Sequence, residues 1–182
     1  MSTNAQLIEF AQAFAHAAHD SIGQRRKYSD DPYWIHTDAV ARLVAQSGAD
    51  TALIVAAHNH DVLEDVAPFN PEFDYAHMVK AIGFLAANYV VELTDVYTKE
   101  AYPYWNRAKR KEHEAHRLSQ ISNGSKTIKL ADIVHNSATI LREDANFAKV
   151  YLLEKAAILP GLVGGDPMLY ELALASSPAY EN

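Results

Sequence analysis

The sequence of 182 residues contains no cysteine. This absence excludes disulfides, thiolate metal ligands and a thiol nucleophile, and it leaves histidine, aspartate and glutamate as the side chains that can hold a metal ion. No apolar run approaches the roughly 20 residues of a membrane-spanning helix, and residues 1–4 lack the charged and apolar regions of a signal peptide. We therefore expect a cytoplasmic protein with no membrane partner.

Basic residues are outnumbered by acidic ones, and the formal net charge is −7. A protein that binds nucleic acid in general carries a basic footprint, so we expect no nucleic-acid partner. Seven of the sixteen lysines and arginines gather in two short segments, residues 25–27 and 107–111. Small basic clusters in an acidic protein suit a small anionic ligand better than a polymer.

Glycine and proline are scarce, at seven residues each, and 49% of the residues are hydrophobic, which is a folded globular composition. Alternation of apolar and polar residues with period two is nearly absent, whereas apolar spacings of three and four recur throughout. We therefore predict an all-α fold. The expected helices cover residues 5–20, 34–47, 51–65, 74–82, 84–95, 105–120, 125–142, 145–159 and 167–176, with a loop at 97–105 and a turn at 122–124.

The chain length fits a single domain over residues 1–182. We expect a motif-bearing core at about 5–145, followed by C-terminal helices at about 145–178. Asp50 is the expected N-cap of the helix that begins at residue 51, and Gly48 and Gly83 are expected to end the helices that precede them.

His60 and Asp61 are adjacent inside the otherwise apolar helix expected at 51–65. Burying them without partners would be costly, because an unpaired carboxylate loses its solvation. A divalent cation removes that penalty, and imidazole with carboxylate is a common ligand mixture. A surface ion pair between the two residues is the alternative.

Asp132 is the one carboxylate in the apolar segment 128–134. It is either a metal ligand or the ion-pair partner of Lys129, three residues earlier on the same helix face. His36, which opens an earlier helix, is a weak candidate by itself. Three helices that each present an oxygen or nitrogen ligand can, however, hold one divalent ion.

These residues carry a resemblance to a known family. His36, the His60-Asp61 pair and the distant Asp132 resemble the H…HD…D pattern of the HD phosphohydrolase superfamily, an HD-domain helical bundle. The surrounding blocks, residues 24–36, 60–65 and 129–136, resemble the hydrolase domain of RelA/SpoT-type alarmone enzymes. The similarity covers roughly residues 5–145. We expect a member of the stand-alone small alarmone hydrolases, a group that includes the animal type.

The resemblance implies a function for each motif. It implies one divalent ion, manganese first and zinc, iron, cobalt or nickel as alternatives, and it places the hydrolytic work on Glu64 and Asp65. These carboxylates lie four residues after His60 and Asp61, on nearly the same helix face. A solvated acidic helix end is the alternative for this pair. The metal ligands that the resemblance implies are His36, His60, Asp61 and Asp132.

The resemblance also implies a small-molecule purine nucleotide as substrate. Its implied contacts are Arg26, Lys27, Asn136 and Thr139. The last two share a helix face with Asp132 because of their spacing. Lys109, Arg110 and Lys111 match the phosphate-binding side chains of related enzymes only loosely, and a solvated charge run is the alternative for them.

The sequence departs from the family pattern at a few positions. His58 lies two positions before His60, about 200° around the helix, so we expect it to be satisfied elsewhere rather than to join the ion. Thr37 follows His36 where the family usually has proline. Ser137 and Ala138 stand where many relatives have an apolar residue and an arginine, which leaves the nucleotide specificity open.

Three functions follow. The leading hypothesis is metal-dependent removal of the 3′-pyrophosphate from guanosine tetra- or pentaphosphate (ppGpp or pppGpp). The second keeps the chemistry and changes the substrate, to that of an HD-type nucleotidase, deoxynucleotide triphosphohydrolase or dinucleotide-cofactor phosphatase. The third is a non-catalytic HD module that binds a nucleotide or partner protein. A homo-oligomer stays open under all three.

Overall fold

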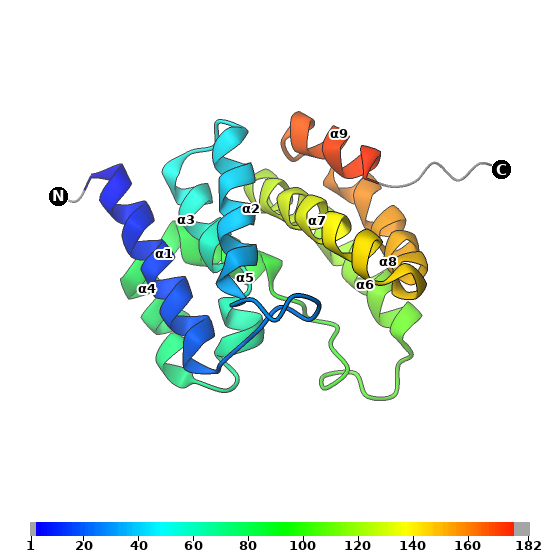
Figure 1. The fold of residues 1–182 in the computed structure, drawn as a ribbon, viewed down its shortest axis with the longest axis horizontal. Helices are drawn as coiled ribbons and strands as arrows, with labels where there is room; N and C mark the ends of the chain where they lie inside the picture. The colour runs from blue at the N-terminus through cyan, green and yellow to red at the C-terminus, as the bar shows by residue number, and fades with distance from the viewer. Residues whose placement is uncertain (1–2, 177–182) are drawn as a thin grey trace. The chain divides into compact units, whose positions relative to one another are not determined.

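A computed structural model describes residues 3–176 of the chain (Figure 1). The chain divides after Thr94 into two compact units. The described residues contain helices and a single isolated β-bridge between Arg25 and Pro32, with no β-strand, so the predicted all-α class is confirmed. None of the described helices combines the length and the apolar character needed to cross a membrane.

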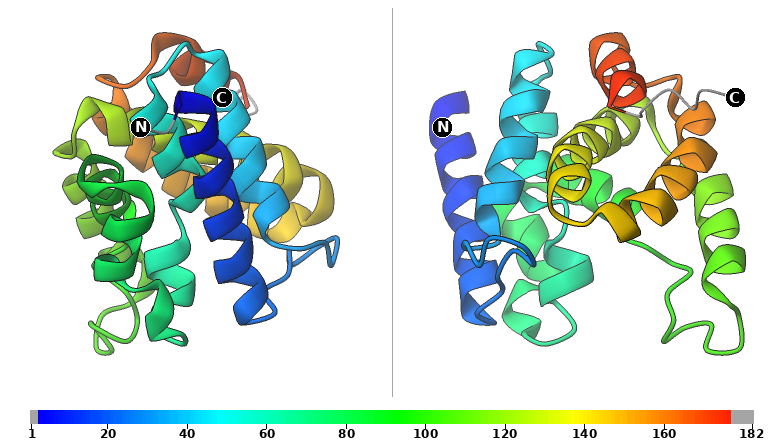
Figure 2. Two further views of the ribbon diagram at one scale, coloured as in Figure 1. Left: turned by 90° about the vertical axis from the view of Figure 1, so that its left-hand side faces the viewer. Right: turned by 45° about the vertical axis from the view of Figure 1, so that its right-hand side comes forward.

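The first unit is built around α3. Its helices are α1 (Asn4–Ser21), α2 (Trp34–Gln46), α3 (Thr51–Asn59), the π-helix η1 (Val62–Val66), the 3-10 helix η2 (Pro71–Phe73), α4 (Tyr75–Ile82) and α5 (Phe84–Leu93). Helix α3 packs against α1, α2 and α5, and Figure 2 shows α1 and α2 lying alongside one another. Ala11, Ala15 and Ala18 form the buried face of α1, and their small side chains let neighbouring helices approach closely.

The second unit is built around α7. Its helices are α6 (Arg107–Ser119), α7 (Asn123–Glu143), α8 (Ala145–Ile158), the 3-10 helix η3 (Leu159–Leu162) and α9 (Pro167–Ala175). Helix α7 packs against α8, η3 and α9. The approach of the chain to α7 is close at Gly165, where an added Cβ atom would lie 2.7 Å from Leu130 Cδ1.

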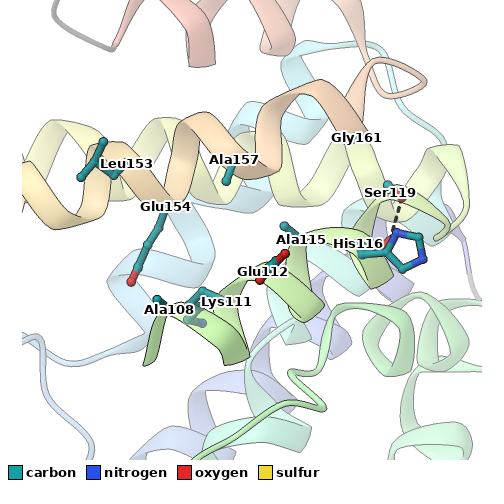
Figure 3. Close-up of a pocket in the computed structure, with 10 residues that line it drawn as sticks. All are labelled: Ala108, Lys111, Glu112, Ala115, His116, Ser119, Leu153, Glu154, Ala157 and Gly161. Carbon is teal, nitrogen blue, oxygen red and sulfur yellow. Dashed lines mark hydrogen bonds between the residues drawn. The ribbon is translucent and has the colours of Figure 1, made fainter. Parts of the chain in front are cut away.

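A groove of about 500 Å³ lies between α6 and α8 in this unit. Figure 3 shows the residues that line it, which include alanines of both helices, the exposed Leu153 of α8, and Gly161. Lys111 is the one residue of the groove that the sequence also associates with phosphate binding.

Two helix boundaries differ from the prediction. The helix expected to continue to residue 65 ends at Asn59, and residues 62–66 form the separate π-helix η1. The turn expected at 122–124 is the start of α7, where the Ser122 hydroxyl accepts a hydrogen bond from the Ser125 backbone N–H. Asp50 caps α3 as predicted, through Leu53 N. The predicted end of the C-terminal helices at residue 178 lies outside the described residues.

Candidate metal centre and hydrolytic site

His60 stands at the point where α3 ends, as the C-cap residue of that helix. Its Nδ1 lies 2.9 Å from the carbonyl oxygen of Ala57. A carbonyl only accepts hydrogen bonds, so Nδ1 carries the proton and Nε2 carries the lone pair. The imidazole is buried, and the end of the helix thus presents a metal-ligating nitrogen in a fixed orientation.

Asp61 brings His36 and His60 together. His60 Nε2 lies 3.1 Å and His36 Nε2 lies 3.6 Å from the same carboxylate oxygen, Asp61 Oδ2. Neighbouring ligands around an ion bound at about 2.0–2.2 Å are separated by roughly 3.0–3.5 Å. Both imidazoles are buried, while Asp61 is 21% exposed. The three side chains therefore have the chemistry and the spacing of a divalent metal site.

Tyr33, the residue immediately before α2, contacts this cluster. Its hydroxyl donates a hydrogen bond to Asp61 Oδ2 over 2.8 Å. The Tyr33 ring contacts the ring of His36, with 5.6 Å between the two centroids. The guanidinium of Arg26 lies over the face of the Tyr33 ring, 5.6 Å from its centroid. Tyr33 therefore connects a predicted substrate-binding residue with a predicted metal ligand.

Glu64 and Asp65 lie in the π-helix that follows Asp61. Single turns of π-helix occur frequently at functional sites. Glu64 is exposed, whereas Asp65 is half-buried, and Asp65 Oδ2 accepts a hydrogen bond of 2.8 Å from Gln24 Nε2. Glu64 and Asp65, which the sequence predicts as a functional pair, therefore have different environments in the structure.

The environment of Asp65 favours its protonated form. Burial and, after it, the negative charge of Asp61 together raise the pKa of Asp65 to about 6. A carboxylate with a pKa near neutrality is suited to proton transfer at physiological pH.

Arg26 and Lys27 occupy the loop between α1 and α2. The Lys27 ammonium lies 3.0 Å from the hydroxyl of Tyr28. Asp30 in this loop has a φ of 57°, a left-handed conformation that is uncommon for a residue other than glycine. Both cations therefore lie in the loop that joins α1 to α2 and ends at Tyr33.

The second unit holds the remaining predicted residues, on α7. Asp132 is buried, and its carboxylate lies 2.9 Å from Lys129 Nζ and accepts a hydrogen bond of 2.6 Å from Asn136 Nδ2. The ion pair with Lys129 that the spacing allowed is therefore present. The Thr139 hydroxyl donates to the carbonyl oxygen of His135 over 3.5 Å. Asp132 and Asn136 are brought together within this unit.

His58 is satisfied away from the cluster, which confirms the prediction for this residue. Its Nδ1 lies 3.0 Å from Asp38 Oδ1. The same carboxylate contacts His16 Nε2 at 3.1 Å and Gln12 Nε2 at 2.9 Å, both from α1. Asp38 therefore joins α1, α2 and α3 rather than forming part of the metal centre.

Three residues of the site are missing from the set of candidates predicted from sequence: His19, Gln24 and Tyr33. Gln24 and Tyr33 lie in the family-like block 24–36, so their contacts could have been sought there. His19 is fully buried at the end of α1, with its Nδ1 2.6 Å from Gln24 Oε1. His19 lies three residues after His16 in an alanine-rich helix, and nothing in that spacing distinguishes a site residue from a packed one.

Comparison with known proteins places the chain in a family. A family model described as an HD domain matches residues 11–146, and the chain belongs to this HD domain family. Family membership implies a divalent metal ion, and the His36, His60 and Asp61 side chains fit that requirement.

Several curated proteins are similar to this chain. MESH1 of Mus musculus, named guanosine-3′,5′-bis(diphosphate) 3′-pyrophosphohydrolase, is 29% identical over 178 residues, which are 93% of this chain and 92% of that protein. A Synechocystis sp. protein named probable guanosine-3′,5′-bis(diphosphate) 3′-pyrophosphohydrolase is 30% identical over 129 residues, 68% of this chain. The chain spans only 16% of the length of the Synechocystis protein and 18% of the GTP pyrophosphokinase rsh of Brucella ovis.

Solved structures show the same fold. The structure of a metazoan ortholog of SpoT that hydrolyzes ppGpp matches with a TM-score of 0.79 at 21% sequence identity, over 97% of this chain and 96% of that one. A Listeria monocytogenes EGD-e protein matches with a TM-score of 0.62 at 19% identity, over 82% of this chain and 96% of that one.

Proposed function

We propose that this protein is a metal-dependent hydrolase that removes the 3′-pyrophosphate from guanosine tetra- or pentaphosphate. The observation that carries the proposal is the convergence of the His36 and His60 Nε2 atoms on one oxygen of Asp61. The 29% identity to MESH1, over 92% of that protein, supports the substrate class. The HD family match crosses Thr94, which supports one hydrolase domain over both units.

His36, His60 and Asp61 would hold the ion, and we propose Asp132 as the fourth ligand and manganese as the ion. Asp132 is a buried carboxylate on an apolar helix, and neither Lys129 nor Asn136 prevents it from binding a cation, since a carboxylate has about four lone-pair sites. A divalent ion bound there supplies Lewis-acid activation of water and neutralises phosphate charge.

Asp65, and with it Glu64, would take the proton of the attacking water. The water oxygen bonds to the phosphorus attached to the 3′ oxygen, the bond between that phosphorus and the 3′ oxygen breaks, and the leaving 3′ oxygen takes a proton from solvent. The products are pyrophosphate and a nucleotide with a free 3′ hydroxyl. The pKa of Asp65, raised by burial to about 6, lets it hold this proton briefly and release it to solvent.

Arg26 and Lys27 would bind the substrate from the loop between α1 and α2, with Asn136 and Thr139 at the nucleoside end. Arg26 is suited to this because a guanidinium plane recognises phosphate and also stacks on a base. Its position over the Tyr33 ring keeps the guanidinium near the metal ligand Asp61.

The test is release of pyrophosphate from ppGpp by the full chain with manganese. We expect turnover by the wild type and none after addition of a chelator. Asp61→Ala should abolish turnover and manganese binding together, because it removes the oxygen on which both imidazoles converge. Glu9→Ala removes an exposed carboxylate of α1 and serves as a matched control, which should keep both turnover and manganese binding.

Two outcomes contradict the proposal in different ways. Dominant release of orthophosphate from another nucleotide would favour an HD-type nucleotide phosphohydrolase instead. Binding of ppGpp without turnover, whichever divalent metal is added, would favour a non-catalytic module. Loss of turnover in Glu9→Ala to the same extent as in Asp61→Ala would remove the assignment of the ion to this cluster.

A further inference from the structure

We infer that Gln24 is a positioning residue for the Asp65 carboxylate and that the buried imidazole of His19 fixes the direction of the Gln24 side-chain amide. The inference rests on the proposed function, in which Asp65 accepts a proton from water. It concerns a chain of contacts from the end of α1 to the π-helix η1, all within the first unit.

The backbone holds His19 and Gln24 against each other. Helix α1 ends with Gly23 at a φ of 63°, a left-handed conformation that suits glycine. Gly23 N donates to Asp20 O and Gln24 N donates to His19 O, each over 3.0 Å. This pair of bonds is a Schellman motif, which closes a helix and turns the chain back on its last turn. Gln24 therefore starts the loop beside His19.

The contacts of the His19 imidazole determine which of its two nitrogens carries the proton. Its Nδ1 lies 2.6 Å from Gln24 Oε1, and an amide oxygen only accepts hydrogen bonds, so Nδ1 carries the proton. Burial lowers the pKa of His19, which is fully buried, so the ring is neutral and Nε2 carries the lone pair.

The other end of the Gln24 amide selects the same orientation. Gln24 Nε2 donates to Asp65 Oδ2 over 2.8 Å. An ionised carboxylate only accepts, and an inverted amide would place its oxygen against that carboxylate. Asp65 therefore requires the Gln24 nitrogen to face it, which leaves the Gln24 oxygen facing His19 Nδ1 as an acceptor.

The consequence concerns the rotation of the Asp65 carboxylate. A carboxylate that takes a proton must aim a lone pair at the water, and the amide hydrogen bond restrains the carboxylate against turning away. His19 acts only through Gln24. Loss of either restraint should lower the rate of the chemical step while leaving the contacts that bind the nucleotide in place.

The first test compares two Gln→Met substitutions in the full chain with ppGpp and manganese. Gln24→Met should lower kcat by about 10–100-fold, the usual loss for a supporting partner, with KM changed less than about twofold. Gln12→Met is the matched control, because Gln12 Nε2 donates a similar hydrogen bond of 2.9 Å to a part-buried aspartate, Asp38. It should leave kcat unchanged. Equal kcat values in the wild type and Gln24→Met would overturn the inference.

The second test separates His19 from Gln24. His19→Leu removes the donor and should reproduce the kcat loss, whereas His19→Asn keeps an N–H on Cγ and should restore most of it. Adding His19→Leu to Gln24→Met should cause no further loss, because the two residues act through one hydrogen-bonded chain. Additive losses in the double variant would show that His19 does not act through Gln24.

The third test needs no turnover. Nitrogen-15 NMR of histidine in the metal-free wild type should show His19 as the neutral Nδ1–H tautomer, and Gln24→Met should shift its Nδ1 signal. An Nε2–H tautomer would overturn the inference whatever the substrate. A wild type that releases no pyrophosphate but shows the Nδ1–H tautomer contradicts the proposed function and leaves the link between His19 and Gln24 supported.

Discussion

Replacement of the buried Lys155 by methionine should make the protein more stable. Lys155 lies in α8 with 2% of its surface exposed. Within the described part of the chain its ammonium hydrogen-bonds the hydroxyls of Ser176 at 2.8 Å and Ser137 at 3.3 Å, and it pairs with no carboxylate. Hydroxyl groups compensate only partly for lost hydration of a charge.

The magnitude follows from the pKa of the ammonium group. Burial lowers the pKa of Lys155 from 10.5 to about 8, a difference equivalent to about 3 kcal/mol in the free energy of unfolding. Methionine has a similar length and no charge, but it leaves two hydroxyls without the ammonium. Ser176 already donates to Ala173 O, so we expect a net gain of about 1–3 kcal/mol at pH 7.

The sign of the pH dependence is fixed. Between pH 8 and 10.5 the unfolded chain binds more protons at this lysine than the folded chain does, so wild-type stability rises with pH in that window. The advantage of Lys155→Met should therefore be full below pH 8 and should shrink towards pH 10.

Urea denaturation at pH 7 and pH 9.5 measures both effects, with Lys149→Met as the control, since Lys149 is an exposed lysine of the same helix. The control should change stability by less than about 0.5 kcal/mol. A Lys155→Met protein that is less stable than the wild type at pH 7, or an advantage that is the same at both pH values, would show that burial of the charged ammonium does not destabilise the fold.

Three further changes test other parts of the structure by urea denaturation. Asp38→Ala should cost about 2–4 kcal/mol, because three side chains of α1 and α3 contact this carboxylate; a loss below 1 kcal/mol would count against that view. Asp65→Asn should stabilise the metal-free protein by about 1–3 kcal/mol at pH 8, because burial raises the pKa of Asp65 from 3.8 to about 6. The folded chain binds the extra proton between those values, so this gain should disappear as the pH falls to about 4, and a gain independent of pH would contradict it. At Asp30, whose φ is 57°, Asp30→Ala should cost about 1 kcal/mol and Asp30→Gly should not; equal losses would exclude backbone strain as the cause.

The helices could be predicted because apolar spacing and capping residues agree along most of the chain. Asp50 and Gly83 mark helix ends in the sequence, and they do so in the structure. The π-helix at 62–66 could not be predicted, since the apolar residues of this segment continue the pattern of α3. The start of α7 was predicted as a turn because Ser122 and the residues after it are typical of turns as well as of helix N-termini.

The part of the candidate site that lies within the sequence motif could be predicted. His36, His60 and Asp61 converge as expected in the first unit. Gln24 lies in the family-like block 24–36, but its contact with His19 could not be predicted, because this hydrogen bond forms only when α1 closes at Gly23. Spacing along a sequence identifies residues on one helix face, and it does not identify partners that meet across a loop.

We propose that the His36, His60 and Asp61 cluster supports hydrolysis at the 3′ end of a guanosine bis(diphosphate). Phosphorus-31 NMR of ppGpp incubated with the manganese-loaded protein, recorded after the manganese has been removed with a chelator, identifies every product of this reaction. We predict equal amounts of GDP and pyrophosphate, formed by the wild type and not by Asp61→Ala. Orthophosphate as the main product, or unchanged ppGpp with the wild type, would contradict the proposed function.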